Sequence, residues 1–198
     1  MTIQEANKLS APRIVKANSI QGKTLVFKNV ERGDAEFILS LRQDTRKSKH
    51  LSKTSASLSD QKKWIENYAN SDNQAYFIIT HKDERIGTVR LYDPVDDSFC
   101  WGSWMLNDNA PMHAAIESTL IVYTYAFKVL GFNRSHFDVR KENKKVCKFH
   151  ERFGATLLSQ GESDYFYSID KIEVFNALER YKKYFDVDIL DNQFVKNK

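Results

Sequence analysis

Three polar side chains share one side of a predicted helix in the C-terminal half of the sequence. Asn143, Cys147 and His150 are spaced by four and three residues, which places them on one stripe of an α-helix. The imidazole of His150 can transfer a proton near neutral pH. The neighbouring stripe, which we expect to face the core, consists of Val146, Phe149 and Phe153. Such spacing fits a helix that lines a groove and equally a helix with one solvated edge.

A second candidate site is a loop that follows a predicted strand and opens a long helix. The strand 98–106 leads into the segment 107–115, where Pro111 is expected to begin the helix. Free N–H groups and the positive dipole end of a helix N-terminus attract anions such as pyrophosphate. The small side chains that would let phosphate oxygens approach these amides are Ala110, Ala114 and Ala115. An ordinary helix start has the same features, so spacing alone leaves both interpretations open.

The strands and helices that would position these candidate residues can be predicted from the pattern of apolar residues. Apolar, β-branched and aromatic runs predict strands, whereas apolar residues at helical spacing predict helices. We expect strands at 24–27, 75–80, 85–92, 98–106, 135–139 and 165–169. We expect helices after caps at Asp34 and Ser59, a long helix from Pro111 stopped by Gly131, and helices at 143–153 and 171–185. The long helix should bury one stripe, formed by Ile116, Leu120, Tyr123, Phe127 and Leu130.

The composition describes one ordinary globular domain. The chain has 198 residues, of which 41% are hydrophobic and 28% charged, and its net charge is +4. A chain of this length buries enough surface to fold without a metal or a disulfide framework. Its cysteines, Cys100 and Cys147, form no Cys-x-x-Cys or zinc-ligand pattern, which argues against a metal site and against a secreted scaffold.

The distribution of charge and hydrophobicity excludes several further classes of protein. The first 22 residues lack the apolar run of a signal peptide, and no stretch approaches the length of a membrane-spanning helix. The weak net charge falls short of a duplex-binding stripe. We therefore expect a cytoplasmic protein with no nucleic-acid and no membrane partner. We divide it into a leader (1–22), a main domain (23–170) and a C-terminal helix and tail (171–198), which would serve as a lid or in a homodimer.

The order of elements from residue 24 to residue 169 resembles the GNAT superfamily of acyl-CoA-dependent N-acyltransferases. The family signature Asn-x6-Tyr-x3-Gly-Phe is matched in spacing by Asn143, by His150 in place of tyrosine, and by Gly154-Ala155. The resemblance implies an α/β (α+β) GNAT fold, in which helices flank a mostly antiparallel, twisted sheet with splayed strands. It implies an enzyme that transfers an acyl group from acyl-CoA to an amine, with no metal.

The resemblance also implies where acyl-CoA binds. In this family the strand before the loop separates from its neighbour, and the pantetheine arm pairs with the exposed strand edge. We therefore expect a gap near Met105 that leads toward His150. The family's glycine-rich pyrophosphate loop is degenerate here, because Ala110, Pro111 and His113 take its place. The residues implied to contact acyl-CoA are Met105, Leu106, Asn107, Ala110, Pro111, Met112, His113, Ala114, Ala115, Asn143 and Cys147.

Direct acyl transfer needs a neutral amine, a polarised thioester carbonyl and a proton for the leaving thiolate. His150 stands at the family's tyrosine position and is the expected acid. The strand 98–106 contains no Asp or Glu, so the amine would lose its proton through water or by positioning. Asp97, in the preceding turn, is the candidate base, although its position is better explained by a role in forming the turn. A backbone N–H near Met105 or Leu106 would stabilise the oxyanion.

The loop 107–115, followed by Glu117 and Tyr-Ala-Phe at 125–127, is similar to that of GNAT enzymes acting on nucleotide-linked amino-dideoxy sugars. This implies transfer of acetyl or a short hydroxyacyl group, such as 3-hydroxybutanoyl, to a dTDP- or UDP-linked amino sugar for O-antigen and other surface polysaccharides. The small residues Gly102 and Ser103 would leave room for the longer acyl group. Cations and aromatic faces would hold the nucleotide. The expected residues are Arg42, Lys49, His50, Arg90, Tyr92 and Trp101.

Two alternatives stay open at this point. A GNAT enzyme acting on protein N-termini or aminoglycosides would have an acidic acceptor cleft, whereas a basic cleft around Arg42 and His50 favours a nucleotide. A catalytically silent CoA- or RNA-binding module is suggested by the degenerate loop and by the missing carboxylate.

Overall fold

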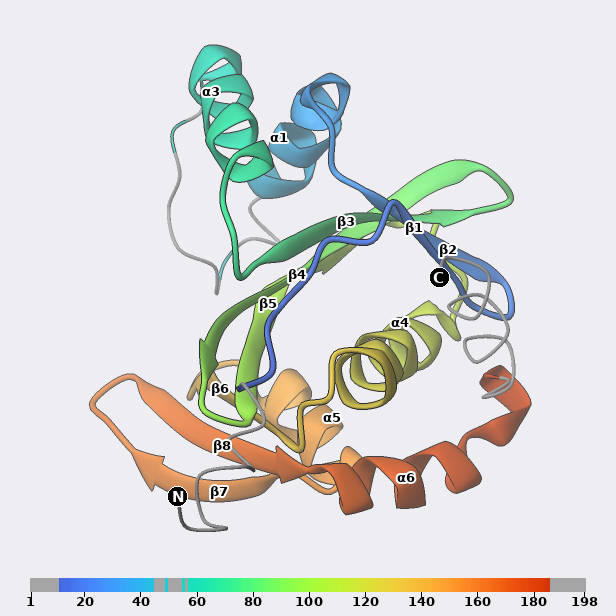
Figure 1. The fold of residues 1–198 in the computed structure, drawn as a ribbon, viewed down its shortest axis with the longest axis vertical. Coiled ribbons are helices and arrows are strands. Elements are labelled where there is room, and N and C mark those ends of the chain that lie inside the picture. The colour runs from blue at the N-terminus through green and yellow to red at the C-terminus, as the bar shows by residue number, and fades with distance from the viewer. Residues whose placement is uncertain (1–10, 45–48, 50–54, 56, 186–198) are drawn as a thin grey trace, which may run out of the picture.

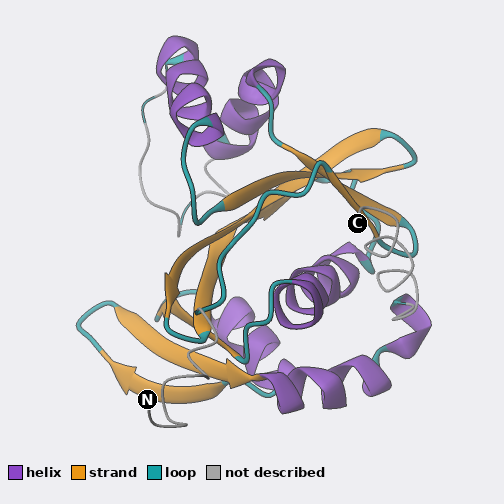
Figure 2. Cartoon of the chain, in the orientation of Figure 1, coloured by secondary structure: helices purple, strands orange, loops and turns teal. Residues whose placement is uncertain are grey.

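One eight-stranded sheet runs through the molecule in the order β1-β2-β3-β4-β5-β6-β8-β7 (Figure 1). The computed structural model describes residues 11–44, 49, 55 and 57–185. Every strand pair is antiparallel except β5–β6, which is parallel. Helices cover both faces of the twisted sheet (Figure 2). The expected α+β architecture, a mostly antiparallel sheet flanked by helices, is confirmed.

The strands and helices have the following bounds. The strands are β1 (Ser19–Gln21), β2 (Leu25–Asn29), β3 (Ala75–His81), β4 (Glu84–Val95), β5 (Ser98–Leu106), β6 (Arg134–Arg140), β7 (Thr156–Gln160) and β8 (Asp164–Asp170). The α-helices are α1 (Ala35–Gln43), α3 (Leu58–Ala69), α4 (Ala114–Thr124), α5 (Lys144–Phe153) and α6 (Lys171–Arg180). Shorter turns are η2 (Arg32–Asp34), η3 (Tyr125–Val129) and η4 (Lys182–Tyr184). In the described part of the chain, no helix has the length and apolar character needed to cross a bilayer.

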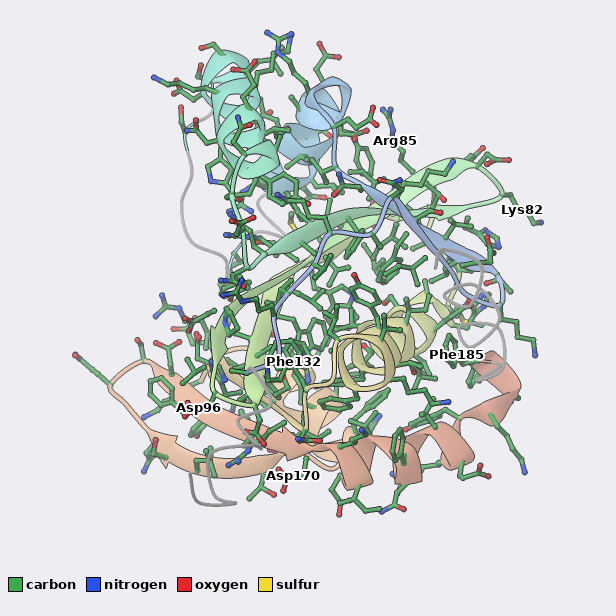
Figure 3. The ribbon with its side chains drawn as sticks, in the orientation of Figure 1. Lys82, Arg85, Asp96, Phe132, Asp170 and Phe185 are labelled. Carbon is green, nitrogen blue, oxygen red and sulfur yellow. The ribbon has the colours of Figure 1, made fainter. Side chains whose placement is uncertain are left out.

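The central strand β3 is buried on both faces. Phe77 and Ile79 belong to the main core beneath the sheet, whereas Tyr76 and Ile78 belong to a smaller cluster under α1 and α3. A strand covered on both faces shows a continuous apolar run rather than alternation, which explains the run at 75–80. Phe132 lies inside the main core beside α4 (Figure 3).

β5 and β6 pair over a short distance and then separate. Their parallel pairing contains two register positions, which end at Phe99 and Ser135. Beyond these residues β5 still pairs with β4, and β6 still pairs with β8, but the facing edges have no strand partner. We call the opening between residues 100–106 of β5 and 136–140 of β6 the fork. The expected gap near Met105 is confirmed.

A β-bulge in β5 lies beside the fork. Thr88 is opposite Met105 and Arg90 is opposite Gly102, so β5 contains one more residue than β4 between these pairs. The extra length is taken up at Ser103, whose φ is 47°. The Ser103 carbonyl accepts a hydrogen bond from the Thr88 hydroxyl at 2.8 Å. A bulge bends its strand, so this one contributes to the divergence of β5 from β6.

The long helix differs from its expected form. α4 begins at Ala114 rather than at Pro111, because residues 111–113 form a turn in which the Ala114 N–H bonds to the Pro111 carbonyl at 2.8 Å. Residues 120–123 are all at most 1% exposed, so α4 is buried all round instead of along one stripe. The reason is its position in the concave side of the sheet, with α6 on its other side (Figure 1). Gly131, with φ of 84°, ends the helical segment as expected.

Other boundaries also differ from the sequence expectations. The cap of α3 is Ser57, whose hydroxyl accepts the Asp60 N–H at 3.3 Å, and not Ser59. The segment expected as a leader contains strand β1, and β7 was not expected at all. All five residues of β7 are exposed, so its sequence carries no alternation between buried and exposed positions. The last α-helix ends at Arg180 rather than at residue 185.

Candidate active site

His150 lies where the fork begins. Its ring centroid is 5.4 Å from that of Trp101 on β5 and 4.3 Å from that of Phe137 on β6. Each of these residues stands two positions beyond the last paired residue of its strand. His150 is 5% exposed, and its Nδ1 atom has no hydrogen-bond partner among the described residues. α5 therefore brings one protonatable ring against both strands at their point of separation.

Burial determines the charge state of this histidine. Desolvation lowers the pKa of His150 from 6.5 to about 4, so the ring is neutral at pH 7. A neutral imidazole still carries one N–H donor and one acceptor nitrogen. The neutral ring of His150 can therefore donate a hydrogen bond at the fork, whereas little of it is imidazolium at pH 7.

The two stripes of α5 differ in part from the expectation. Phe153 is buried in the core as expected, and Val146 and Phe149 are partly buried against it. Cys147 and His150, from the stripe expected to be polar, are also buried. His150 is drawn inward because it packs among aromatic rings at the fork, so it does not lie on a solvated edge.

Cys147 does not line the fork. It borders a groove of about 610 Å³ between α5 and the β7–β8 hairpin, where Tyr165 and Tyr167 also contribute. Because β6 separates β8 from the fork, the expected contact of Cys147 with acyl-CoA does not fit this position. Asn143 is different: it is partly exposed at the N-cap of α5, and its side chain makes no cap hydrogen bond.

A cavity of about 460 Å³ opens on the other face of the sheet, below α1 and α3. Arg42 from α1, Arg90 and Tyr92 from β4, and Ser103 from β5 contribute to its wall. Arg42, Arg90 and Tyr92 were all expected to bind the acceptor, and they contribute to the wall of the same cavity. Because Ser103 belongs to the bulge, the cavity adjoins the fork.

Trp101 lies on the opposite face from this cavity, against expectation. It is opposite Leu91 in register, and paired residues of neighbouring strands point to the same face. Its indole N–H donates to the Tyr123 hydroxyl at 3.2 Å within the core. Side chains alternate along a strand, so Arg90 and Tyr92 point the other way.

The side chain of Arg90 is held from several sides. Its guanidinium lies 5.1 Å from the ring centre of Trp64 and 4.9 Å from that of Tyr92. Its Nε donates to the Gln74 side-chain oxygen at 2.9 Å, and Nη2 donates to the same atom. Two aromatic faces and one amide therefore fix a positive charge in the cavity wall.

Several lining residues were not found from the sequence. Trp64 of α3 is 37% exposed and contributes to the cavity wall. Tyr76 is 2% exposed, and its hydroxyl has no hydrogen-bond partner in the described part of the chain. Desolvation raises the pKa of Tyr76, so the hydroxyl keeps its proton. The apolar run at 75–80 predicts a buried strand, and nothing in it indicates that the Tyr76 hydroxyl would face a cavity.

Other predicted acceptor residues lie away from the cavity. The Lys49 side chain is exposed, and its ammonium is 3.9 Å from the Glu142 carboxylate. His50 lies outside the described residues. A Cβ on Gly102 would lie 2.9 Å from the Tyr92 hydroxyl, so the Tyr92 side chain borders the space expected above Gly102.

Asp97 is not placed to act as a base. It lies in the β4–β5 turn, at the paired end of the two strands, where its carboxylate is 3.3 Å from the Arg134 guanidinium. Six residues of extended chain separate it from the bulge at Ser103, a span of about 20 Å. The prediction for Asp97 is therefore corrected.

The loop between β5 and α4 is built around Asn107. The Asn107 N–H bonds to the Ile86 carbonyl of β4 at 2.8 Å, and its side chain accepts the Asn109 N–H at 3.0 Å. Backbone N–H groups point alternately to the two sides of a strand. The N–H of Leu106 therefore faces the fork, whereas that of Met105 faces β4. Of the two expected oxyanion donors, only Leu106 fits.

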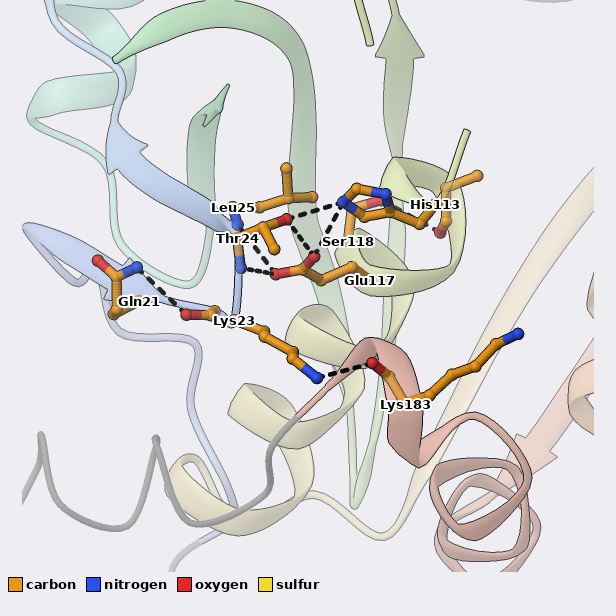
Figure 4. A network of polar contacts seen from close by, with 10 residues as sticks. Gln21, Lys23, Thr24, Leu25, His113, Glu117, Ser118 and Lys183 are labelled. Carbon is orange, nitrogen blue, oxygen red and sulfur yellow. Dashed lines mark hydrogen bonds and ion pairs between the residues drawn. The ribbon is translucent and has the colours of Figure 1, made fainter. Parts of the chain in front are cut away.

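The first turn of α4 is fixed to the sheet by a buried carboxylate (Figure 4). Glu117 is 0% exposed and accepts the N–H groups of Thr24 and Leu25 at 2.6 and 2.9 Å, together with the Thr24 hydroxyl at 2.6 Å. The His113 ring lies 2.8 Å from the same hydroxyl, so its side chain is turned toward β2 and away from the loop. Met112 is fully exposed, whereas the Ala114 side chain is fully buried.

These features meet the needs of a thioester ligand in part. The unpaired edge of β5, the Leu106 N–H, the first amides of α4 and the Asn143 side chain could hold acyl-CoA. The side chains of His113 and Ala114 are not available to it. In the described residues, no three His, Cys, Asp or Glu side chains gather into a metal-binding cluster.

Comparisons with known proteins agree with this geometry. A family model described as an acetyltransferase (GNAT) domain matches residues 24–156. The solved structure of apo FdhC, described as a nucleotide-linked sugar GNAT, is 37% identical, with a TM-score of 0.76 over 87% of this chain and 100% of that chain. The search of curated proteins gave no significant match.

More distant structures share the fold. A GCN5-related N-acetyltransferase from Brucella melitensis is 17% identical, with a TM-score of 0.72 over 89% of each chain. A spermidine N-acetyltransferase from Vibrio cholerae, solved with CoA and spermine, is 16% identical, with a TM-score of 0.67 over 77% of this chain and 99% of that chain.

The lowered pKa of His150 predicts a specific sensitivity to acid. Below pH 6.5 the unfolded chain binds a proton at this residue, which the folded protein takes up only near pH 4. Lowering the pH from 6.5 to 4 should therefore reduce the free energy of unfolding by about 3 kcal/mol through His150. Denaturant unfolding at pH 7 and pH 4 should show this loss in the wild type and not in His150→Asn. The control His81→Asn, at a partly exposed histidine, should keep it; equal acid sensitivity in all three proteins would contradict the assignment.

Proposed function

Because the chain belongs to the GNAT acetyltransferase family, we propose that it acylates the amine of a nucleotide-linked amino-dideoxy sugar. The donor is acyl-CoA, carrying acetyl or a short hydroxyacyl group such as 3-hydroxybutanoyl, and the acceptor is a dTDP- or UDP-linked sugar of surface-polysaccharide biosynthesis. The observation that carries this proposal is the cavity with Arg42 and Arg90 in its wall beside the fork. The 37% identity to a nucleotide-linked sugar GNAT supports the same acceptor class.

The charge of the cavity favours an anionic acceptor. Arg42 and Arg90 provide two fixed positive charges, against one carboxylate, Asp60, among the described lining residues. Guanidinium groups bind phosphate oxygens through paired N–H donors, and the Tyr76 hydroxyl offers one more donor. Protein N-termini and aminoglycosides are cationic, so the same charges disfavour them. The aromatic rings of Trp64 and Tyr92 offer faces to a sugar or a base.

The fork is the proposed position of the donor. When bound, acyl-CoA supplies an acyl group activated as a thioester. The unpaired edge of β5 would pair with the pantetheine arm, and the Leu106 N–H would hold an oxygen that faces it. The first amides of α4 and the Asn143 side chain would hold the polar parts that extend beyond the strand end.

His150 is proposed to act as a neutral donor at the leaving sulfur. Its ring contacts Trp101 and Phe137 at the start of the fork, so an N–H there can point to an atom lying between the strands. With a pKa of about 4 it would not deliver its proton as imidazolium at pH 7. It would instead stabilise the departing sulfur by a hydrogen bond, as a tyrosine hydroxyl does at the corresponding position of the family.

Thiol release from acyl-CoA tests the proposed acceptor. Acetyl-CoA and 3-hydroxybutanoyl-CoA are each offered with dTDP- and UDP-linked amino sugars, an aminoglycoside and a peptide with a free N-terminus. We expect turnover with a nucleotide-linked sugar and at least about tenfold lower kcat/KM with the cationic acceptors, because two arginines line the cavity. Preference for the aminoglycoside or peptide would contradict the acceptor class. No turnover with any amine would favour the silent CoA- or RNA-binding module.

Replacement of His150 tests its role at the sulfur. His150→Phe keeps an aromatic ring but removes the donor, and turnover should fall about 10 to 1,000-fold while the affinity for CoA stays near the wild-type value. His150→Tyr restores a donor and should recover most of the turnover. Thermal unfolding of each variant controls for loss of folding. Full activity of His150→Phe would remove this residue from the mechanism.

A further inference from the structure

A carboxylate stands across the fork from the bulge. Phe99 of β5 is in register with Ser135 of β6 at the last paired position. Counting three residues further along both parallel strands places Asp138 at the level of Gly102. In-register residues of neighbouring strands point to the same face of the sheet. Arg90 is the partner of Gly102 on β4. By this count, Asp138 therefore lies across the fork from Arg90 and Gly102, on the face of the sheet that carries the cavity, which we call the acceptor face.

The burial pattern of β6 supports this orientation. Phe137 and Val139 are buried in the main core, and Phe137 packs against His150. Asp138 lies between them in sequence and is exposed, so it points to the opposite face, the one that carries the cavity. The carboxylate also acts electrostatically on Tyr92 and Cys100, which lie on β4 and β5. Sequence analysis sought an acid on β5 and overlooked this one on β6.

The proposed reaction needs a proton acceptor near the amine of the sugar, on the acceptor face of the fork. An amino-sugar amine is largely protonated at neutral pH, and an ammonium nitrogen has no lone pair with which to attack. Asp60 lies in the first turn of α3, where its carboxylate accepts the Ser55 hydroxyl at 2.6 Å. Asp97 is remote, in the β4–β5 turn. Asp138 is the carboxylate on the acceptor face of the fork that has no ion pair or hydrogen bond among the described contacts.

Resting on the proposed function, we infer that Asp138 is the general base that takes the proton of the acceptor amine, directly or through one water. The N–H bond breaks and its proton moves to the carboxylate. The freed electron pair forms the N–C bond to the thioester carbon, and the C–S bond breaks with its electrons on sulfur. The nitrogen then loses a second proton, which passes through water to that sulfur. The products are the amide and the free thiol of CoA. The gap in the sheet is what allows a group on β6 to face an amine above Gly102.

Other charged and titratable groups lie around Asp138. On its own strand, Arg140 pairs with Asp164 at 3.0 Å, and His136 contacts Ser98 and Asp93. The positive charge of Arg90, on β4, attracts a carboxylate and repels an ammonium group. Burial raises the pKa of Cys100 to about 11 and also that of Tyr92, so both are neutral near pH 7. The side chain paired with Asp138 on β8, Phe166, carries no charge.

Substitution of Asp138 combined with a change of acceptor tests the inference. In Asp138→Asn, kcat at pH 7 should fall about 100-fold or more, with the affinity for the nucleotide sugar, measured by calorimetry, within a few-fold of wild type. The loss should shrink above the amine pKa of about 8, where the amine is already neutral. With an aminooxy analogue of the sugar, whose nitrogen is neutral at pH 7, Asp138→Asn should match the wild type. Asp138→Glu should retain most activity.

Asp83→Asn, at an exposed carboxylate in the β3–β4 turn, is the matched control and should leave both reactions unchanged. Wild-type rates in Asp138→Asn would overturn the inference alone. An equal loss with the amine and the aminooxy acceptor, at all pH values, would also overturn it, because that pattern indicates positioning rather than proton transfer. Absence of any transfer by the wild type to nucleotide-linked amino sugars would overturn the proposed function and this inference with it.

Discussion

The structure depends on two parallel strands that pair at two positions and then separate. Backbone N–H and C=O groups along an unpaired edge need partners, because leaving them buried and unbonded is costly. In β5 one edge is satisfied by β4, and the other is open from residue 100 to residue 106. The bulge at Ser103 and the aromatic contacts of His150 with both strands keep the opening from closing. A ligand with an extended amide-bearing arm can satisfy this edge as a further strand would.

The alternation of side chains then divides the chemistry between the two faces of the sheet. On the core face, Trp101 and Phe137 surround a neutral His150, which can donate but carries no charge. On the acceptor face, Arg90 is clamped between two aromatic rings beside the bulge. A fixed positive charge therefore lies on one side of the sheet, and an uncharged hydrogen-bond donor lies on the other. The opening at the fork is the place where the two sides meet.

The sequence predicts much of the architecture and less of the site. The strands at 75–80, 85–92 and 98–106 follow from apolar runs, and the helix at 143–153 follows from apolar spacing and from Gly154. These elements are confirmed. Strand β7 could not be found, since exposed edge residues carry no period. The face to which a strand residue points could not be predicted from the sequence where it depends on the register with a neighbouring strand. Trp101 faces the core because it pairs with Leu91, and no local pattern contains that pairing.

Amide hydrogen exchange across β5, with and without saturating CoA, tests most directly whether the fork holds the donor. The Met105 N–H faces β4 and should exchange slowly in both states. The Leu106 N–H faces the fork and should exchange rapidly in the free protein and at least about tenfold more slowly with CoA. Unchanged exchange at Leu106, in a sample in which calorimetry shows that CoA is bound, would place the donor elsewhere and contradict this account.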